Sequence, residues 1–490
     1  MSKPLMISLG LYTALFFWYY PPICGIEDEQ GFVNQAIFWS HGAISAEGAG
    51  LSKNLGDLME VAGRHVPMRH PGRSLITLPF YLAGGYPAIF ISGYLIHITM
   101  VLLAIKILVR LNCSANGAIL LLFHPTLLIY SRTIMADASA GTCLLISVYV
   151  LAKPSRLNVY DCILAGLGVS LAATMRHHAS AALPAVVFAV YLRQKSIRDA
   201  LAVIVASAIG ALPLILLNLY VYHTIGDPYS TKRGVFDIDF LKFQIPFYVM
   251  ALSVFWPLMF FSIVLVRGQI QAVMIGICST FLAMLGCYYF HDTGTNPIQT
   301  MILGLRLMQV ALPTWIIGYV VVISQRINPY GRIPVRYLNR SNLIGFQSLS
   351  LTLLSIMTTL IFRAHQNQLL DYDLRRQAML HAIPVNSLVL VEGMMPKLAG
   401  IYREDQPDYE FHLVTFDGHK SYSDEKIEAE TAQSHPVHLL YSPKSAGGQP
   451  SKEFRELVEN LQAESIKTNH PQVYAWKSRK PATGSGSIAP

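Results

Sequence analysis

Long apolar runs recur along most of this 490-residue chain, and they constrain its fold more than any other feature. Each run approaches the roughly 20 residues that an α-helix needs to cross the hydrocarbon core of a bilayer. The composition agrees, because 53% of the residues are hydrophobic and only 13% are charged, against about 25% charged in an ordinary soluble domain. The pattern predicts an α-helical polytopic membrane protein.

Eleven of these runs are predicted to cross the membrane. They cover residues 5–22, 86–109, 117–131, 137–153, 160–175, 178–192, 199–222, 246–267, 269–290, 303–325 and 342–363. The first run could instead be a cleaved signal peptide, but it is long, rich in aromatic residues and lacks a cleavage site between small residues. We therefore expect a transmembrane domain over residues 1–363.

The distribution of Lys and Arg indicates the orientation of the chain. Every second connection between the predicted spans is basic, through Lys106, Arg110, Lys153, Arg156, Arg193, Lys195, Arg198, Arg267, Arg326, Arg332, Arg336 and Arg340. Cytoplasmic loops collect such residues, so the N-terminus is predicted to be cytoplasmic, and the net charge of +8 needs no nucleic acid as partner. The connection 23–85 after the first span then lies on the non-cytoplasmic face, and the odd number of spans places the C-terminal region there as well.

The region after residue 363 has a different character. Residues 361–490 contain 14 Lys and Arg against 16 Asp and Glu, whereas the first 360 residues contain 23 against 13. Four short runs in it are predicted to be strands, at 387–392, 411–416, 436–442 and 472–477. Helix-like stretches separate them, which favours a small parallel α/β domain over 364–478 on the outer face. The tail 479–490 is predicted to be disordered.

The six cysteines indicate no special chemistry. All of them lie in or beside apolar runs, and none falls in the polar C-terminal region. No pair has the spacing of a metal-binding or redox motif. Neither a disulfide framework nor thiol redox chemistry is therefore expected.

Three consecutive acids, Glu27, Asp28 and Glu29, follow the first span, although most of the predicted transmembrane region avoids acids. Residues 61–360 contain seven Asp and no Glu. The residues after the acids have a helical apolar pattern, which predicts an amphipathic helix lying along the membrane interface. The N-terminus of a helix favours an ionised carboxylate by about 0.3–1 kcal/mol, and this applies to a helix cap as much as to a catalytic acid. The residues alone leave both readings open.

Here the sequence resembles a known family. The pattern D-E-x-x-F-x-x-x-A, from Asp28 to Ala36, resembles the D-E-x-x-Y-x-x-x-A motif in the first outer loop of GT-C membrane glycosyltransferases. The branch is that of the protein O-mannosyltransferases and the lipid A aminoarabinose transferases. Phe32 replaces the Tyr of that motif, which keeps the ring and loses the hydroxyl. Looser matches follow in family order, in RHPGRSLITLPFYLAGG (69–85), TIGDPYST (224–231) and GLRLMQVALP (304–313).

The resemblance implies a fold and a reaction. Such enzymes have the GT-C fold and move a hexose or pentose from a polyprenyl-phosphate carrier to an acceptor hydroxyl, usually with inversion. The acceptor is a glycolipid, a polysaccharide or a protein on the non-cytoplasmic side, here most consistent with a bacterial inner membrane. The predicted topology agrees independently, because nucleotide sugars are cytosolic and an outer site needs a lipid-linked donor. By this resemblance Asp28 is the candidate base, and Glu29 either supports Asp28 without touching the substrate or orients the substrate.

A departing lipid phosphate needs cations, and Arg offers two donors in a geometry that fits phosphate oxygens. Several Arg fall on the predicted outer face, against the charge bias. The candidates for the donor phosphate are Arg176, Arg132, Arg69 and Arg306. Arg176 is the strongest, because similar enzymes often place a cation after the corresponding span. For each Arg the alternative is contact with lipid headgroups, with the side chain reaching toward the interface.

Asp137, His70 and His177 are secondary candidates on the same face. Acids beside a membrane boundary are often functional, although Asp137 could equally cap a helix or pair with Arg132. His70 and His177 are read as substrate or phosphate contacts. A divalent metal is possible, but no ligand spacing such as H-E-x-x-H supports one, and no metal ligand is predicted.

Two other classes of function stay open. A transporter or flippase of lipid-linked saccharides should place charges near the bilayer midplane, whereas the polar groups of this chain gather at one face. A structural or assembly protein would act through its outer domain and tolerate substitution near Asp28. That domain could recognise the acceptor, cover the active site or be purely structural.

Overall fold

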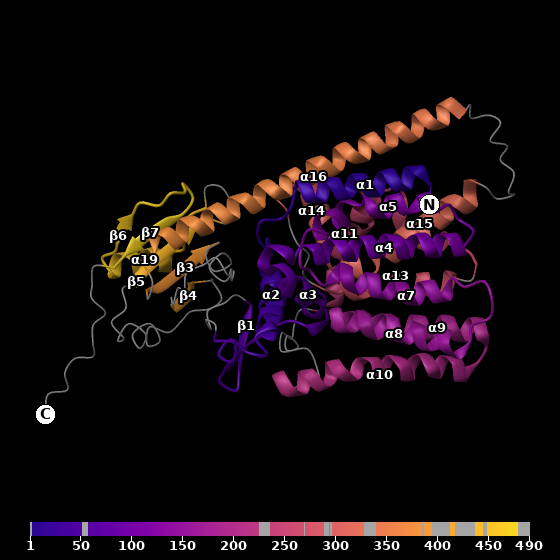
Figure 1. Cartoon of the computed structure of the whole chain (residues 1–490), viewed down its shortest axis with the longest axis horizontal. Coiled ribbons are helices and arrows are strands. Elements are labelled where there is room, and N and C mark those ends of the chain that lie inside the picture. Colours follow the sequence, from indigo (N-terminus) through magenta and orange to yellow (C-terminus); the bar gives the residue numbers. More distant parts are fainter. Residues whose placement is uncertain are drawn as a thin grey trace. The chain divides into compact units, whose positions relative to one another are not determined.

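Figure 1 shows the computed structural model of the chain. It describes residues 2–50, 57–224, 236–268, 270–288, 294, 296–327, 340–384, 387–393, 412–416, 437–443 and 448–478. The chain divides into two units. Unit 1 comprises Met1–Tyr20, His70–Phe80 and Ala88–His365, and unit 2 comprises Pro21–Arg69, Tyr81–Pro87 and Gln366–Pro490. Two helices, α3 (Pro71–Ala88) and α16 (Arg340–Ala382), contain residues of both units.

Unit 1 is built from helices. Its α-helices, besides the parts of α3 and α16, are α1 (Lys3–Trp18), α4 (Ile91–Arg110), α5 (Ala118–Leu122), α6 (Pro125–Tyr130), α7 (Asp137–Leu151), α8 (Val159–Met175), α9 (Leu183–Gln194), α10 (Ile197–Tyr222), α11 (Leu241–Val254), α12 (Ser262–Leu265), α13 (Gln271–Gly286), α14 (Pro297–Gly304) and α15 (Leu312–Ile327). Short 3₁₀ turns join several of them, including η2 (His177–Ala182) and η6 (Leu307–Val310). Most of the longer helices run side by side (Figure 1).

Small residues let these helices approach closely, as is usual for helix pairs in lipid. A Cβ added at Gly166 of α8 would lie 2.4 Å from the backbone oxygen of Val203 in α10. One added at Gly168 would lie 2.6 Å from Ser147 Oγ in α7, on the other side of the same helix. The helices α7, α8 and α10 therefore pack in that spatial order through glycine contacts.

In the part of the chain that the structure describes, two helices, α4 and α10, are long and apolar enough to cross a membrane. A third candidate is the pair 238–254 and 259–265, which is bent by 105°. The helices α1, α7, α8 and α13 are apolar but shorter, as is α15 over Leu312–Gln325. The prediction of membrane-spanning helices is confirmed for the fold in this coarse sense, and the count of eleven stays a prediction.

Some predicted spans are not single straight helices. The run 117–131 forms two short helices, α5 and α6, which break at Phe123 before Pro125. Proline has no backbone N–H to donate and fits the first turn of a new helix. The run 246–267 is interrupted after α11, where Leu258 adopts a φ of 64°. Conversely, α16 continues through the predicted boundary at residue 363 without a break.

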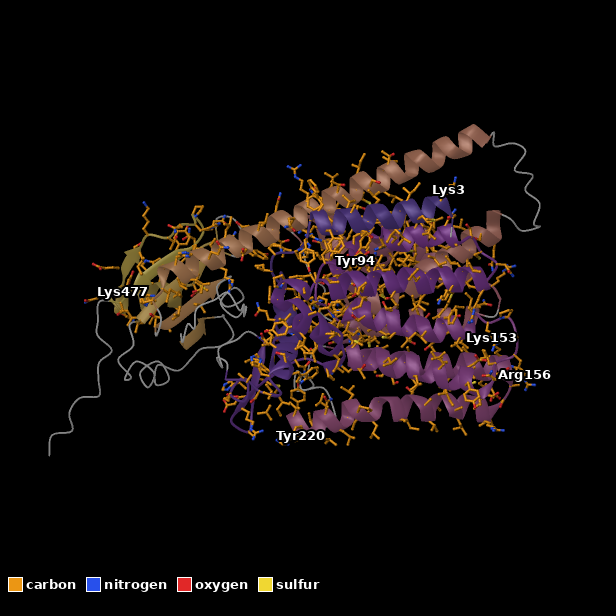
Figure 2. The ribbon with its side chains drawn as sticks, viewed as in Figure 1. Lys3, Tyr94, Lys153, Arg156, Tyr220 and Lys477 are labelled. Atoms are coloured by element: carbon orange, nitrogen blue, oxygen red, sulfur yellow. The ribbon has the colours of Figure 1, made fainter. Side chains whose placement is uncertain are left out.

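Two basic residues of a predicted inner loop, Lys153 and Arg156, lie at the same end of unit 1 as Lys3. Figure 2 places Lys3, Lys153 and Arg156 at one end of its helices and Tyr220, near the end of α10, at the opposite end. At the basic end, Lys153 Nζ lies 2.7 Å from Asp161 Oδ2. Arg110 lies over the Tyr149 ring at 3.5 Å. Among the described residues, one end of the unit therefore collects positive charge from loops that are separate in the sequence.

Unit 2 contains a five-stranded sheet. Its strands are β3 (Leu388–Gly393), β4 (His412–Phe416), β5 (Val437–Ser442), β6 (Glu464–Ile466) and β7 (Tyr474–Lys477), in the spatial order β4-β3-β5-β7-β6. β3 is parallel to both β4 and β5, whereas β7 is antiparallel to β5 and to β6. The predicted small sheet domain is present, but the sheet is mixed and not purely parallel. The predicted tail 479–490 lies outside the described residues.

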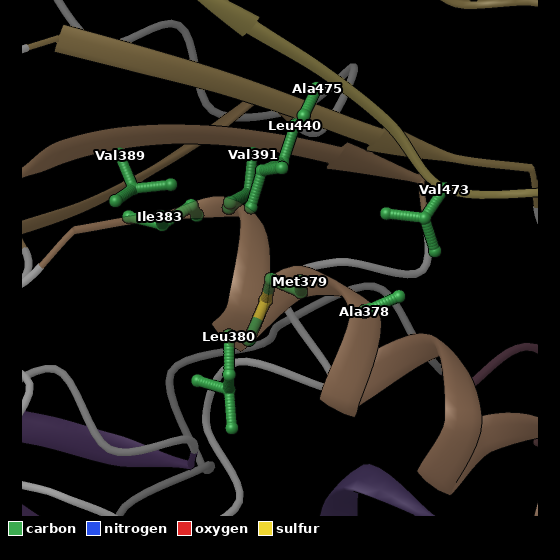
Figure 3. Packing of buried hydrophobic residues seen from close by; sticks show 9 residues of the cluster. All are labelled: Ala378, Met379, Leu380, Ile383, Val389, Val391, Leu440, Val473 and Ala475. Atoms are coloured by element: carbon green, nitrogen blue, oxygen red, sulfur yellow. The ribbon is translucent and has the colours of Figure 1, made fainter. Parts of the chain in front are cut away.

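Helices cover both faces of this sheet, because successive side chains of a strand point to opposite sides. One face packs Val389, Val391, Leu440 and Ala475 against the end of α16, as Figure 3 shows. The other face packs Leu390, Leu439, Tyr441 and Trp476 against Phe454 of α19 (Lys452–Asn460). Ser451 caps α19 through its Oγ, which accepts the Phe454 N–H at 3.1 Å. The apolar runs of the C-terminal region therefore form a three-layer arrangement.

Unit 2 also holds the start of the connection that is predicted to lie on the outer face. Helix α2 (Glu27–Ser40) is followed by a hairpin of β1 (Leu58–Val61) and β2 (Arg64–Pro67). The hairpin turns through Ala62 and Gly63, both with positive φ, as a tight two-residue turn requires. The polar side chains of α2 that would face the interface, Gln30, Asn34 and Gln35, are at most 5% exposed. Helix α2 is buried on all sides from Glu29 to Phe38, and its place along the membrane interface stays a prediction.

The start of α3 supplies a test of packing in unit 1. A Cβ at Gly72 would lie 2.7 Å from the backbone carbon and oxygen of Thr174 in α8, whereas one at Gly10 of α1 would meet nothing within 4 Å. We expect Gly72→Ala to destabilise the protein by roughly 1–3 kcal/mol through overpacking. Gly10→Ala should leave stability unchanged or slightly raised. Thermal unfolding of the two purified variants in one detergent checks this, and equal melting temperatures would contradict the contact.

Candidate active site

Glu29 caps the N-terminus of α2. Its carboxylate oxygen Oε1 accepts the backbone N–H groups of Gly25 at 3.0 Å and Ile26 at 2.9 Å. The side chain is fully buried. These donors are among those that a helix leaves without an intrahelical partner, so Glu29 acts as a cap at the third helical position. Of the two readings of the acidic cluster, capping therefore applies to Glu29.

Asp28 faces a different partner. The Nη2 group of Arg69 donates to Asp28 Oδ1 at 2.7 Å. The same Nη2 group donates to Asp57 Oδ1 at 2.8 Å, and Arg69 Nε donates to Asp57 Oδ2. The side chains of Asp57 and Arg69 are 5% and 8% exposed, whereas that of Asp28 is 23% exposed. One guanidinium therefore joins two carboxylates, and Asp28 is the more accessible of them.

The hairpin explains how Asp57 reaches Arg69. Leu58 pairs with Pro67 across β1 and β2, and the Met68 N–H donates to the Asp57 carbonyl at 3.0 Å. The residues just before β1 and just after β2 are thus neighbours. Asp57 was not among the predicted site residues. The turn at Ala62 and Gly63, between two short apolar runs, is the sequence signal that could have found it.

A second group of predicted residues lies in unit 1, at the start of α3. His70 precedes Pro71, which occupies the first helical position, and Gly72 then touches the backbone at the end of α8. This approach brings His70 Nε2 to 2.9 Å from His177 Nδ1, so that one ring nitrogen donates and the other accepts. His70 is 7% exposed, and His177 lies at the surface. Two distant histidines of the prediction are therefore in contact.

Arg176, the residue before His177, forms an ion pair with Asp137. Arg176 is the C-cap of α8, and its Nη2 donates to Asp137 Oδ2 at 3.0 Å. Asp137 lies in the first turn of α7 and is fully buried, while the Arg176 side chain is 12% exposed. The alternative considered for Asp137, a pair with Arg132, is replaced by this pair with Arg176. A buried carboxylate needs such a partner, since an unpaired charge there is costly.

Arg73 is a cation that the prediction did not select. It lies one turn after His70 on α3 and is fully buried. Its Nη2 donates to the Thr133 carbonyl at 3.2 Å, in the segment that leads to Asp137. Its position three residues after His70 is the sequence signal that could have identified it.

Arg132 has a structural setting. Its Nη1 donates to the Phe362 carbonyl at 3.2 Å and to His365 Nδ1 at 2.9 Å, and its Nη2 donates to the Tyr19 carbonyl. The guanidinium carbon lies 4.9 Å from the centre of the Phe362 ring. These contacts join the ends of α1 and of the unit 1 part of α16. They give Arg132 a role in holding helices together.

Arg306 is the remaining candidate of the predicted site. Arg306 is half-buried and precedes η6, next to the end of α14. The segment TIGDPYST lies mostly outside the described residues. His65 Nδ1 lies 2.5 Å from Glu47 Oε1; burial acts to raise the pKa of Glu47, but the hydrogen bonds from His65 lower it below its usual value. Among the described residues, no group of three or more His, Cys, Asp or Glu could hold a metal ion.

Most of the predicted residues thus fall into two groups, one in each unit, and Arg132 and Arg306 belong to neither group. The group in unit 2 joins Asp28 and Arg69, with Glu29 as a cap and Asp57 as an unpredicted member. The group in unit 1 joins His70 to His177 and Asp137 to Arg176. Chemically, the first group offers an oriented carboxylate, and the second offers a guanidinium and imidazoles.

The fold is similar to that of solved structures. Over 99% of both chains, the structure matches ArnT from Cupriavidus metallidurans bound to undecaprenyl phosphate, with a TM-score of 0.62 and 8% identity. The apo state of that protein matches over 98% of both chains, with a TM-score of 0.59 and 9% identity. The arabinofuranosyltransferase AftD from Mycobacteria matches over 98% of this chain and 40% of its own, with a TM-score of 0.51 and 11% identity.

No family model and no curated protein sequence matches the chain. At such low identities the structural likeness concerns the fold. Both solved relatives are glycosyltransferases of GT-C fold. This confirms, for the fold, the resemblance first seen from Asp28 to Ala36. The chain therefore has the GT-C fold of membrane glycosyltransferases.

Proposed function

We propose that the chain is an integral membrane glycosyltransferase that moves a sugar from a polyprenyl-phosphate donor to an acceptor hydroxyl. The likeness to ArnT over 99% of both chains carries this proposal, because that structure holds undecaprenyl phosphate. Asp28, in the motif that first indicated the family, supports it independently. It is partly accessible and held by Arg69, as an oriented base should be.

We further propose that the reaction takes place on the non-cytoplasmic side of a bacterial inner membrane. The end of unit 1 that carries Lys3, Lys153 and Arg156 would face the cytoplasm, following the positive-inside rule. The connection 23–85 and the soluble domain over 364–478 would then lie outside. Nucleotide sugars do not reach that face, so the donor must be delivered on a lipid.

In this mechanism Asp28 acts on the acceptor. The acceptor oxygen attacks the anomeric carbon of the sugar while its proton passes to a carboxylate oxygen of Asp28. The bond from the anomeric carbon to the phosphate oxygen breaks, and the polyprenyl phosphate leaves with the electron pair. Attack from the side opposite the phosphate inverts the anomeric centre. Glu29 contributes by fixing the start of α2, and thereby the position of Asp28.

Arg176 is our first candidate for the donor phosphate. Its guanidinium is fixed by Asp137, and a planar guanidinium has further N–H groups that fit phosphate oxygens. Arg73, His70 and His177 are the additional polar groups of the same unit that could contact a phosphate. Arg306 remains a candidate of the same kind. Arg132 and Arg69 are assigned other roles, because protein carbonyls hold the first and carboxylates hold the second.

The orientation can be tested with two engineered cysteines in a background without the native ones. Arg64 begins β2, directly after the turn of the hairpin, and Arg156 lies at the basic end of unit 1; both are exposed. We expect Arg64→Cys, but not Arg156→Cys, to react with a membrane-impermeant maleimide in intact cells. Both should react after the membrane is permeabilised. The opposite pattern would reverse the proposed topology.

The base can be tested with purified protein and radiolabelled polyprenyl-phosphate sugars. We expect Asp28→Asn to lose at least about 10²–10⁴-fold in transfer rate, because the amide cannot accept the acceptor proton. Asp239→Asn is the matched control, since Asp239 is 76% exposed in unit 1, and it should transfer normally. Full activity of a folded Asp28→Asn variant would refute the assigned base. Lipid transport without any transfer would favour a flippase.

The phosphate site can be tested at Arg176. Arg176→Lys keeps the charge opposite Asp137 but loses the paired donors of the guanidinium. We expect it to lower kcat/KM for the donor by roughly tenfold or more while the acceptor KM stays unchanged. Arg198→Gln, an exposed residue on α10, is the control. Because Arg176→Gln would leave Asp137 unpaired, Asp137→Asn/Arg176→Gln serves as the second variant. Normal donor kinetics in both variants would exclude this role.

A further inference from the structure

The guanidinium of Arg69 has a second carboxylate partner that the proposed mechanism leaves without a role. Asp57 receives two hydrogen bonds from Arg69, through Nε and Nη2, and Asp28 receives one, through Nη2. Asp57 is 5% exposed, so substrate contact belongs to Asp28. Asp57 therefore acts on the site through Arg69.

We propose that Asp57 is a positioning residue that fixes Arg69. Arg69 in turn orients the Asp28 carboxylate, and the negative charge of Asp57 offsets the positive charge that Arg69 presents to Asp28. This inference rests on the proposed role of Asp28 as the base of a glycosyl transfer. The three residues lie in one unit.

The hydrogen-bond geometry supports the orienting role. A guanidinium is planar, and two parallel donors to one carboxylate fix its plane and its rotation. Once Nε and one hydrogen of Nη2 are bound to Asp57, the direction of the second Nη2 hydrogen is fixed. This hydrogen is donated to Asp28 Oδ1, and the distance from Nη2 to Oδ1 is 2.7 Å. A single contact between Arg69 and Asp28 would leave the arginine side chain free to rotate.

The charges support the second half of the proposal. A guanidinium beside a carboxylate stabilises its ionised form, and this makes the carboxylate a weaker base. Asp57 supplies a counter-charge to the same guanidinium. The carboxylate of Asp28 is then held by a hydrogen bond, without the full attraction of an uncompensated cation.

The helix that carries Asp28 is shaped to admit this arrangement. Gly31 lies three residues after Asp28, on the same side of α2. A Cβ at Gly31 would lie 2.1 Å from Asp57 Oδ2 and 2.5 Å from Arg69 Cγ. Any other residue at this position would push the Asp57–Arg69 pair away from α2. The backbone carbonyl of Arg69 is also bound to α2, where it accepts from Gln35 Nε2 at 3.3 Å.

The test uses the full-length protein and two variants that change the charge around Asp28 in opposite directions. Asp57→Asn leaves Arg69 uncompensated, so the acidic limb of the pH profile of kcat should move to lower pH. Arg69→Met leaves Asp28 near Asp57 without a cation, so the limb should move to higher pH. Both variants should lose about 10–100-fold in kcat, since small displacements of a catalytic group cost that much. The donor KM should change by less than about threefold, because neither residue binds the donor phosphate in this scheme.

Two further variants separate positioning from a merely structural role. Gly31→Ala displaces the pair without changing any charge, so kcat should fall while the acidic limb stays within the wild-type range. Glu47→Gln removes a carboxylate of the same connection that is bound to His65, and it should transfer normally. A structural role for Asp57 predicts a lower melting temperature with unchanged kcat per folded molecule. The proposal would be overturned if the acidic limb of the kcat profile did not move in Asp57→Asn and Arg69→Met. It would also be overturned if the limb moved in the same direction in both variants.

The ionisation of Asp28 can be followed without any transfer. The infrared carboxyl band that is lost in Asp28→Asn is titrated in the wild type, in Asp57→Asn and in Arg69→Met. Opposite displacements of this titration support the arrangement even if no polyprenyl-phosphate sugar is a substrate, in which case the proposed function fails alone. Sugar transfer by the wild type together with an unmoved titration rejects the positioning role and leaves the proposed function standing.

Discussion

The cost of burying charge governs this structure. Asp57, Arg69, Arg73, Arg132 and Asp137 are nearly inaccessible in a protein made largely of apolar helices. A buried charge without a partner costs several kcal/mol, so each needs an acceptor, a donor or a counter-charge. The described contacts supply them, from two carboxylates around Arg69 to three acceptors around Arg132. The choice of partner then decides what each residue can do. Where carbonyls hold an arginine it joins helices, and where a carboxylate holds it the pair can still face a substrate.

This requirement explains why similar sequence signals have different outcomes. Arg132 and Arg176 both precede or end an apolar helix on the predicted outer face, and both were candidates for the donor phosphate. Arg132 contacts the ends of two other helices, whereas Arg176 pairs with Asp137 at the start of α7. Asp28 and Glu29 are adjacent, yet one is held by Arg69 and the other by backbone N–H groups. Neighbouring helical positions point about 100° apart, so adjacent acids meet different surroundings.

Much of the fold could be predicted, because the signals are local. The predicted run 160–175 corresponds to α8 (Val159–Met175), and 199–222 corresponds to α10 (Ile197–Tyr222). The strands β3 and β5 lie within one residue of their predicted ranges. The mixed direction of the sheet and the continuity of α16 were missed, because strand pairing and helix length depend on tertiary packing. The partners of Asp28 and Asp137 were missed for the same reason, since both come from distant segments.

The glycines of this chain nevertheless carry information about those distant partners. A glycine inside a helix is unfavourable by roughly 0.5–1 kcal/mol relative to alanine, so its presence there needs a reason. At Gly31 the reason is the Asp57–Arg69 pair, and at Gly72 it is the backbone at the end of α8. Each of these glycines lies within three residues of a candidate site residue, Asp28 in one case and His70 in the other. In a helical protein of this kind, the charged residues indicate which groups could react. The helical glycines beside them indicate where a distant segment comes close enough to hold those groups in place.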